Sequence, residues 1–278
     1  MIDIKDKIRH VSWLISRSLY LDSNLVKNLE LTSSEKTSLL VKKYSELLKT
    51  HVFKSEERKV SILGHDYYYF DPYAHSLLIS IILDNLFLRK YLKPGSIIVD
   101  IGANIGQYYF FAKHILKAKQ VFSFEPLPFI FKILKKNNPT SYNLGISTKK
   151  NGKITIPDCD IFASMCIKPS SDSIPIKLAK LDGVDAIKKL TRIDLLKIDV
   201  EGAELDVLKS AGHSLKKSRY LLVEMSVDRP SMGDIQTTFS FLKTNFSEFK
   251  VIYMGLPLIR FDKCECVDVL FKNTHYAE

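Results

Sequence analysis

Two hydrophobic runs that end in carboxylates constrain this chain more than any other feature. Residues 97–106 read Ile-Ile-Val-Asp-Ile-Gly-Ala-Asn-Ile-Gly, and residues 193–204 read Ile-Asp-Leu-Leu-Lys-Ile-Asp-Val-Glu-Gly-Ala-Glu. Each run predicts a β-strand that stops at an acid, and the first continues through a glycine turn into an amphipathic segment. Open α/β sheets bind ligands at the carboxyl ends of their strands. We therefore expect both acidic clusters to lie along that edge of one sheet.

From about residue 71 the chain alternates between helical and extended patterns. Strands are predicted at residues 96–101, 120–124, 141–146, 193–198 and 219–225. Helices are predicted at residues 106–117, 129–137, 183–190 and 205–210, the last with Gly212 as its stop signal. Two later strands, at residues 249–253 and 266–271, are expected to form an antiparallel edge. This alternation predicts an α/β fold with a doubly wound, mainly parallel sheet and helices on both faces.

We expect two parts along the chain. Residues 1–70 have helical spacing of apolar residues up to about residue 57 and then a short hairpin pattern, which predicts a helical N-terminal extension. These helices could cap a substrate or form a homo-oligomer surface. Residues 71–278 form the α/β domain. Within it, residues 147–190 are interpreted as an insertion over the ligand edge, where variable loops set substrate choice.

The balance of charges is basic, with 41 Lys and Arg against 31 Asp and Glu and a net charge of +10. Such a charge fits contact with nucleic acid, but the lysines are spread as small pairs, which favours a solvated surface. No apolar run is long enough to span a membrane, and none has the form of a signal peptide. The four cysteines lack zinc-ligand spacing. We expect a cytoplasmic protein with reduced thiols, no membrane span and no favoured nucleic-acid partner.

The glycine turn after the first acidic strand differs from a dinucleotide-binding turn. It reads Asp100-x-Gly102-x-Asn104-x-Gly106 rather than G-x-G-x-x-G. Asp100 would repel a pyrophosphate at the start of the following helix. S-adenosylmethionine carries a sulfonium and an ammonium and no phosphate, so Asp100 would attract it, while the two glycines allow close approach of the backbone. Asn104 would stabilise the turn or donate to the ligand carboxylate. The alternative is that Asp100 only caps the helix.

The next strand delivers another carboxylate, Glu125, at its end, followed by Pro126. A carboxylate in this place can accept hydrogen bonds from both hydroxyls of a ribose, as the acid after the glycine turn does in dinucleotide folds. Together, the turn and Glu125 predict an S-adenosylmethionine site. The alternative interpretation makes Glu125 an ordinary loop acid.

The second acidic strand places Lys197 and Asp199 on one face, with Glu201 close by. Methyl transfer to a hydroxyl needs a base that takes the proton as the oxygen attacks. Asp199 or Glu201 could be that base, and Lys197 could tune it or orient the acceptor. In the structural alternative, Glu201 caps a helix with Glu204 in its first turn, and Lys197 pairs with a carboxylate such as Glu224. We favour the structural role for Glu204 and the functional one for Asp199, and both roles stay open for Lys197 and Glu201.

These strings resemble the FkbM family of S-adenosylmethionine-dependent methyltransferases. The likeness runs from about residue 92 to residue 270 and rests on residues 98–106, Phe124-Glu-Pro126, Tyr142-Asn-Leu-Gly-Ile-Ser147, Leu181-Asp182 and above all residues 193–204. It implies a Rossmann-like seven-stranded sheet with a reversed final strand, and O-methylation of a hydroxyl on a sugar, glycan or other small molecule. By this likeness the cofactor would be lined by Asp100, Gly102, Asn104, Gly106, Glu125, Pro126, Asn143 and Leu144.

Other functions are compatible with the sequence. An RNA or protein methyltransferase would account for the basic charge, and a non-catalytic module could keep the fold and the cofactor. Oxygen atoms of Asp199, Glu201 and Glu224 could hold a divalent metal, but nothing else in the sequence supports one, so no metal site is assigned. The sequence does not identify the methyl acceptor.

Overall fold

The computed structural model describes residues 57–69, 72–155, 173–227, 234–255, 258–260 and 263–276, together with residues 32, 34, 37 and 41. The chain separates into two compact units, residues 1–91 with 260–262 and residues 92–259 with 263–278. Apart from the four isolated positions, the predicted N-terminal helices lie outside the described residues, and so does the oligomer surface assigned to them. No helix in the described parts of the chain has the length and apolar character needed to cross a membrane.

Between residues 57 and 91, the described part of the first unit contains a hairpin and two helical segments. β1 (Arg58–Ile62) and β2 (His65–Tyr69) pair antiparallel, as the sequence predicts. The turn between them uses left-handed backbone at Leu63 and Gly64, with φ of 52° and 79°. After it come the helix α3 (Pro72–Asp84) and the 3-10 helix η1 (Leu86–Lys90).

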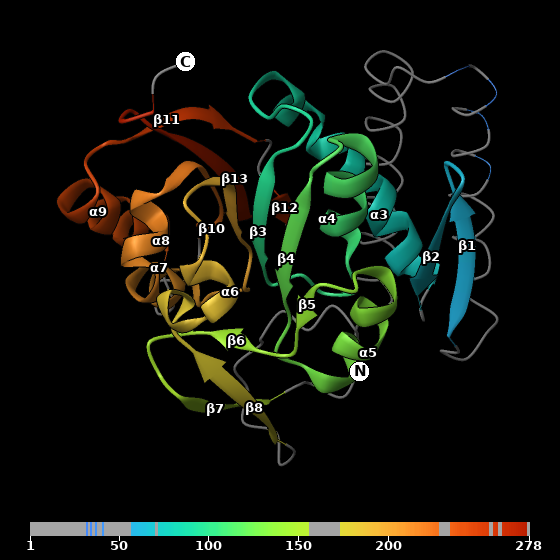
Figure 1. Ribbon diagram of the computed structural model, residues 1–278, viewed down its shortest axis with the longest axis horizontal. Helices are drawn as coiled ribbons and strands as arrows, with labels where there is room; N and C mark the ends of the chain where they lie inside the picture. The colour runs from blue at the N-terminus through green and yellow to red at the C-terminus, as the bar shows by residue number, and fades with distance from the viewer. Residues whose placement is uncertain are drawn as a thin grey trace. The chain divides into compact units, whose positions relative to one another are not determined.

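The second unit is built on a twisted sheet in the order β11-β13-β10-β9-β3-β4-β5, with β12 (Leu258–Arg260) also paired to β13 (Figure 1). The seven strands of this path are β3 (Ile97–Ile101), β4 (Gln120–Phe124), β5 (Ser141–Tyr142), β9 (Ile193–Ile198), β10 (Ser218–Ser226), β11 (Phe249–Met254) and β13 (Lys263–Asn273). β10, β9, β3, β4 and β5 are parallel, whereas β13 is antiparallel to β10 and β11. The predicted mainly parallel sheet with a reversed final strand is confirmed. The two late strands form the antiparallel edge expected from the sequence, because β11 pairs with β13 and β13 joins the sheet at β10.

Helices cover both faces of this sheet. Figure 1 shows α7, α8 and α9 on one side and α4 and α5 on the other. The helical segments of this unit are α4 (Gln107–Phe110), the π-helix η2 (Phe111–Ile115), α5 (Pro128–Asn137), the 3-10 helix η3 (Leu181–Gly183), α6 (Asp185–Lys188), α7 (Glu204–Ser210), α8 (Gly212–Lys216) and α9 (Ile235–Asn245). The predicted helix at residues 205–210 ends at Ser210, as α7 does, but the sequence missed α8, which begins at Gly212, and α9.

Both faces of β3 and β9 are buried, and alternation places Asp100 and Lys197 on the same face as the apolar Ile98 and Leu195. The neighbours of Asp100 on β3, and those of Lys197 on β9, lie in the main apolar core together with Val207 and Leu208 of α7. Successive residues of a strand point to opposite faces. Asp100 and Lys197, which are register partners across β3 and β9, therefore both point away from this core.

A small second sheet follows β5. Its order is β6-β8-β7, from β6 (Gly145–Ile146), β7 (Asn151–Thr155) and β8 (Ser173–Ala179). The single strand predicted at residues 141–146 is wrong, because Asn143 and Leu144 turn the chain from one sheet into the other. Residues 156–172 of the predicted insertion lie outside the described residues, and its place over the ligand edge stays a prediction.

Candidate functional site

The glycine turn after β3 passes close to the end of β9. Gly102 has a φ of 81°, and a Cβ atom there would lie 1.7 Å from the backbone oxygen of Asp199. The N–H groups of Gly102 and Ala103 donate to the carbonyl of Phe124 at 3.1 and 3.0 Å, and the N–H of Asp199 donates to the carbonyl of Ile101 at 3.0 Å. The close approach at Gly102 is therefore made by a neighbouring strand end, which joins β3, β4 and β9 at one point.

Asn104 and Gly106 shape the rest of this turn. Both have left-handed backbone, with φ of 49° and 96°. Oδ1 of Asn104 accepts a hydrogen bond from the N–H of Ile105 at 2.7 Å, so the side chain serves the turn, one of its two expected roles. A Cβ atom at Gly106 would lie 3.1 Å from Leu134 and 3.3 Å from Asn137. The space beside Gly106 is therefore filled by α5.

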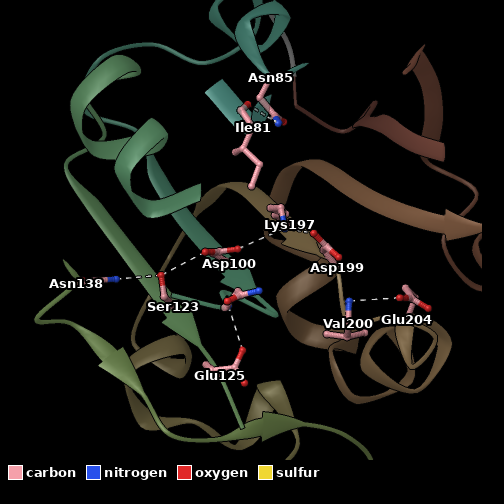
Figure 2. A network of polar contacts seen from close by, with 11 residues as sticks. Ile81, Asn85, Asp100, Ser123, Glu125, Asn138, Lys197, Asp199, Val200 and Glu204 are labelled. Atoms are coloured by element: carbon pink, nitrogen blue, oxygen red, sulfur yellow. Dashed lines mark hydrogen bonds and ion pairs between the residues drawn. The ribbon is translucent and has the colours of Figure 1, made fainter. Parts of the chain in front are cut away.

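Glu125 connects the glycine turn to the loop after β4 (Figure 2). Oε2 accepts a hydrogen bond from the N–H of Asn104 at 3.1 Å, and Oε1 accepts one from the N–H of Leu127 at 2.9 Å. The side chain is buried, and burial raises the pKa of Glu125 to about 7. Each carboxylate oxygen can accept a second hydrogen bond. Glu125 can therefore brace the turn and still receive donors from a cofactor.

Three residues predicted to line the cofactor surround the backbone of Glu125. Nδ2 of Asn143 donates to the carbonyl of Glu125 at 2.9 Å and to that of Pro126 at 3.0 Å. The N–H of Leu144 donates to the carbonyl of Glu125 at 3.2 Å. The structure thus brings Pro126, Asn143 and Leu144 together at this loop, where the Asn143 amide braces the chain.

Asp100 lies inside β3, and a cation of the protein itself balances its charge (Figure 2). It is 0% exposed, Oδ1 lies 3.7 Å from Nζ of Lys197, and Oδ2 accepts a hydrogen bond from Oγ of Ser123 at 3.4 Å. Burial raises the pKa of Asp100 to about 6, with Lys197 opposing and Asp199 adding to the rise. Neither a helix cap nor a free anion describes this residue. Lys197 balances part of this charge, and the role of Asp100 beside a cofactor stays a prediction.

Lys197 lies between two carboxylates, one buried and one open to solvent. Its Nζ donates a hydrogen bond to Oδ2 of Asp199 at 2.9 Å, and the side chain of Asp199 is 34% exposed. Burial acts to lower the pKa of Lys197, but Asp199 and Asp100 outweigh it and the pKa lies above its usual value. The partners of this ammonium are Asp199 and Asp100, and Figure 2 shows the three side chains in one chain of contacts.

Further carboxylates lie beside Asp199. Asp199, Glu201 and Glu224 each present an oxygen, and the three atoms lie within 4.8 Å of one another. Burial raises the pKa of Glu224 well above its usual value, and the charges of Asp199 and Glu201 add to this. Oxygen ligands at such spacing could hold a divalent cation, although Asp199 is already bound to Lys197.

Glu204 has the structural role favoured for it. Its Oε1 accepts hydrogen bonds from the N–H groups of Gly202 at 2.9 Å and Val200 at 3.3 Å. Burial raises the pKa of Glu204 to about 6. Helix α7 begins at Glu204 with Ala203 as its N-cap, so the proposed cap at Glu201 is not formed. Glu201 instead occupies the turn before the helix, with a φ of 55°.

Two residues at this site were not predicted. Ser123 is the register partner of Asp100 on β4, and strand alternation would have placed it on the same face. Tyr108, on α4, lies with its ring centroid 5.1 Å from Nζ of Lys197. The predicted helix at residues 106–117 gave no signal for this contact, because which side of a short helix meets the sheet depends on tertiary packing.

Residues 100–250 match the family model described as the methyltransferase FkbM domain. The hexuronic acid methyltransferase AglP of Haloferax volcanii is 31% identical over 147 residues, which cover 50% of this chain and 59% of that protein. The 31-O-demethyl-FK506 methyltransferase FkbM of Streptomyces tacrolimicus is 26% identical over 176 residues, which cover 49% of this chain and 67% of that protein. The match to AglP thus spans less than two thirds of that relative's length.

Among solved structures, methyltransferase FkbM from Methylobacillus flagellatus KT aligns with a TM-score of 0.44 and 15% identity, covering 72% of this chain and 55% of that one. Aeropyrum pernix fibrillarin in complex with S-adenosyl-L-methionine aligns with a TM-score of 0.44 and 12% identity, covering 80% and 85%. The family model matches more than half of the 278 residues. The chain therefore belongs to the methyltransferase FkbM domain family.

Proposed function

We propose that this protein is an S-adenosylmethionine-dependent O-methyltransferase acting on a hydroxyl of a glycan, a sugar or another small molecule. The observation that carries the proposal is the hydrogen bond of 2.9 Å between Lys197 and Asp199 at the carboxyl end of β9, beside the turn that Glu125 braces. Family membership supports methyl transfer. The names of two relatives, for a hexuronic acid and for 31-O-demethyl-FK506, support a sugar-like or other small-molecule acceptor.

The residues on the cofactor side suit a cationic nucleoside. S-adenosylmethionine, when bound, supplies a methyl group on a sulfonium centre. Glu125 would receive the two ribose hydroxyls, because each of its oxygens has one hydrogen bond in place and can accept another. The carboxylates of Glu125 and Asp199 would disfavour a pyrophosphate at the same edge.

On the acceptor side, Asp199 would be the base. Lys197 engages Oδ2 of Asp199, which leaves Oδ1 to take the proton of an acceptor hydroxyl. The ammonium also limits rotation of the carboxylate, so Lys197 would orient the base. Glu201 lies close to Asp199 and adds negative charge to the surroundings, which favours a neutral hydroxyl over an acidic group.

The first experiment screens glycans and small metabolites by mass spectrometry for the gain of one methyl group in the presence of the protein and cofactor. Calorimetry with S-adenosylmethionine runs in parallel, and EDTA followed by magnesium tests whether the carboxylates need a metal. We expect heat of cofactor binding and at least one methylated product. A wild-type protein that binds no S-adenosylmethionine would disprove the proposal.

The role of Asp199 is tested by Asp199→Asn. We expect kcat to fall on the order of a hundredfold, because an amide cannot take the proton, while the cofactor Kd changes little. Asp185→Asn is the matched control, since Asp185 lies on α6 and pairs only weakly with Lys188 at 3.5 Å. Equal kcat values for the two variants would exclude Asp199 as the base.

A second candidate, RNA methylation, rests on the net charge of +10. It predicts binding of RNA that weakens steeply with salt. The carboxylates around Asp199 disfavour a phosphate backbone next to the reacting group, so we place the small-molecule acceptor first. Salt-sensitive RNA binding together with methylated RNA as the product would reverse this order.

A further inference from the structure

We propose that Tyr108 is a positioning residue of this site, and that its aromatic ring holds the ammonium of Lys197 against Asp199. The proposal rests on the function proposed above for Asp199 and identifies a side chain through which that carboxylate is kept in place. Tyr108 is the second residue of α4, directly after the glycine turn.

The geometry around Lys197 carries the argument. Its Nζ lies 2.9 Å from Oδ2 of Asp199, 3.7 Å from Oδ1 of Asp100 and 5.1 Å from the ring centroid of Tyr108. A cation within about 6 Å of a ring centroid is attracted to the face of the ring, and the attraction is strongest where water is excluded. The side chain of Lys197 is 10% exposed, so little water competes. The ring therefore acts on the ammonium together with the two carboxylates.

The ring, rather than the hydroxyl, makes this contact. Tyr108 is 2% exposed, and among the described residues its hydroxyl has no hydrogen-bond partner. A buried hydroxyl without a partner contributes nothing favourable to folding. A phenylalanine at position 108 should therefore keep the interaction with Lys197, whereas a flexible aliphatic side chain of similar length should lose it.

Loss of the ring would free the ammonium without removing it. Lysine is a flexible side chain, and Asp100 offers a competing carboxylate 3.7 Å away on the buried side. The hydrogen bond to Asp199 would then be made for a smaller fraction of the time. Because this change affects the orientation of the base and not the binding of the acceptor, we expect kcat to fall while KM changes little.

The first test measures Lys197 directly and needs no acceptor. Wild type, Tyr108→Met, Tyr108→Phe and the matched control Tyr109→Met are treated with an amine-acetylating ester, and acetylation of Lys197 is followed by mass spectrometry with Lys113 as internal reference. We expect several-fold faster acetylation of Lys197 in Tyr108→Met only. Unchanged acetylation in Tyr108→Met, or equally fast acetylation in Tyr108→Phe, would overturn the proposal. If Tyr108→Met does not fold, Tyr108→Phe still tests the proposal, because faster acetylation of Lys197 in that variant would overturn it.

The second test uses methyl transfer to an acceptor found in the screen. We expect kcat to fall on the order of tenfold in Tyr108→Met with KM within about twofold, and Tyr108→Phe to restore it. In a Lys197→Met background, Tyr108→Met should have little further effect, because residues that act through one another are not additive. Full additivity, or a KM effect alone, would refute the role. Absence of any methyl transfer would refute the proposed function. The acetylation test would still show whether the ring of Tyr108 holds the ammonium of Lys197.

Discussion

Gly102 shows how one residue without a side chain lets three strand ends meet. A Cβ atom at Gly102 would clash with the carbonyl oxygen of Asp199, which would lie 1.7 Å away, and the φ of Gly102 is 81°. The clashing atoms belong to the backbone of Asp199, just after β9, and not to a flexible side chain. They cannot make room for a Cβ atom unless Asp199 itself is displaced. Substitution here should disturb both folding and the candidate base.

We therefore expect Gly102→Ala to lower the free energy of unfolding far more than Gly95→Ala. Gly95 has a similar φ of 89°, but a Cβ atom there meets nothing within 4 Å. The control should thus show only the left-handed strain of about 1–2 kcal/mol, and Gly102→Ala this strain plus the clash. Urea unfolding of both variants measures the difference, and equal midpoints would contradict the clash.

If Glu125 binds the cofactor as proposed, we expect cofactor binding to depend on pH. Burial raises its pKa to about 7 in the free protein, so near neutrality part of the population carries a proton there. Only the ionised carboxylate accepts from both ribose hydroxyls at once, so binding should favour ionisation. We expect the Kd for S-adenosylmethionine to decrease as pH rises from about 6 to about 8. Calorimetry across this range measures it, and Glu125→Gln should bind weakly with a flatter profile. A Kd that rises with pH would contradict this role.

At the scale of elements, α8 depends on a side chain from outside the helix. Asp182 of η3 accepts hydrogen bonds from the N–H groups of His213 at 2.7 Å and Ser214 at 2.8 Å, and from Oγ of Ser214 at 2.7 Å. These bonds satisfy donors in the first turn of a five-residue helix, which would not be stable by itself. The Leu181-Asp182 string of the sequence thus has a structural explanation.

We expect Asp182→Ala to lower the free energy of unfolding by about 1–2 kcal/mol, as loss of a helix cap does. Asp185→Ala, three residues on and exposed, should change it by less than about 0.5 kcal/mol. Chemical denaturation of the two variants gives the comparison. A loss of equal size in both would show that Asp182 does not stabilise α8.

The elements themselves were predicted unevenly, for physical reasons. β4 and β9 have the predicted bounds, because a buried parallel strand is a short apolar run that can be recognised locally. Residues 141–146 also looked like one strand, but their backbone pairs with two different sheets. The helix before Gly212 ends at Ser210 as predicted, but the sequence did not show that a second helix starts at Gly212, because the Asp182 carboxylate that supports it is distant in sequence.

At the scale of the whole molecule, several buried carboxyl groups should set how stability depends on pH. The pKa values are about 6 for Asp100, about 7 for Glu125 and about 6 for Glu204, each raised first by burial. In the unfolded chain these groups would titrate near about 4. Between these limits the native state binds more protons than the unfolded state, so the free energy of unfolding falls as pH rises from about 5 to about 8.

Glu204→Gln should reduce that slope. Oε1 of Glu204 makes both of its hydrogen bonds, and among the described residues Oε2 has no partner, so a neutral amide keeps the contacts without the buried charge. We expect the variant to match wild type near pH 5 and to exceed its stability near about pH 8. Thermal unfolding at both pH values measures this. A wild-type stability that rises over the same range would contradict the prediction.

The sequence by itself determined the α/β class, the strands that end in acid and the residues gathered at their carboxyl edge, because side-chain periodicity and strand ends are local properties. It also carried the family resemblance that the family match confirms. Only the tertiary structure decided how these charges are paired. Asp100 lies beside Lys197, Gly102 makes room for Asp199, and the ring of Tyr108 faces an ammonium. Such pairings depend on which strands are neighbours and which face of a helix meets the sheet, and neither is encoded within one segment.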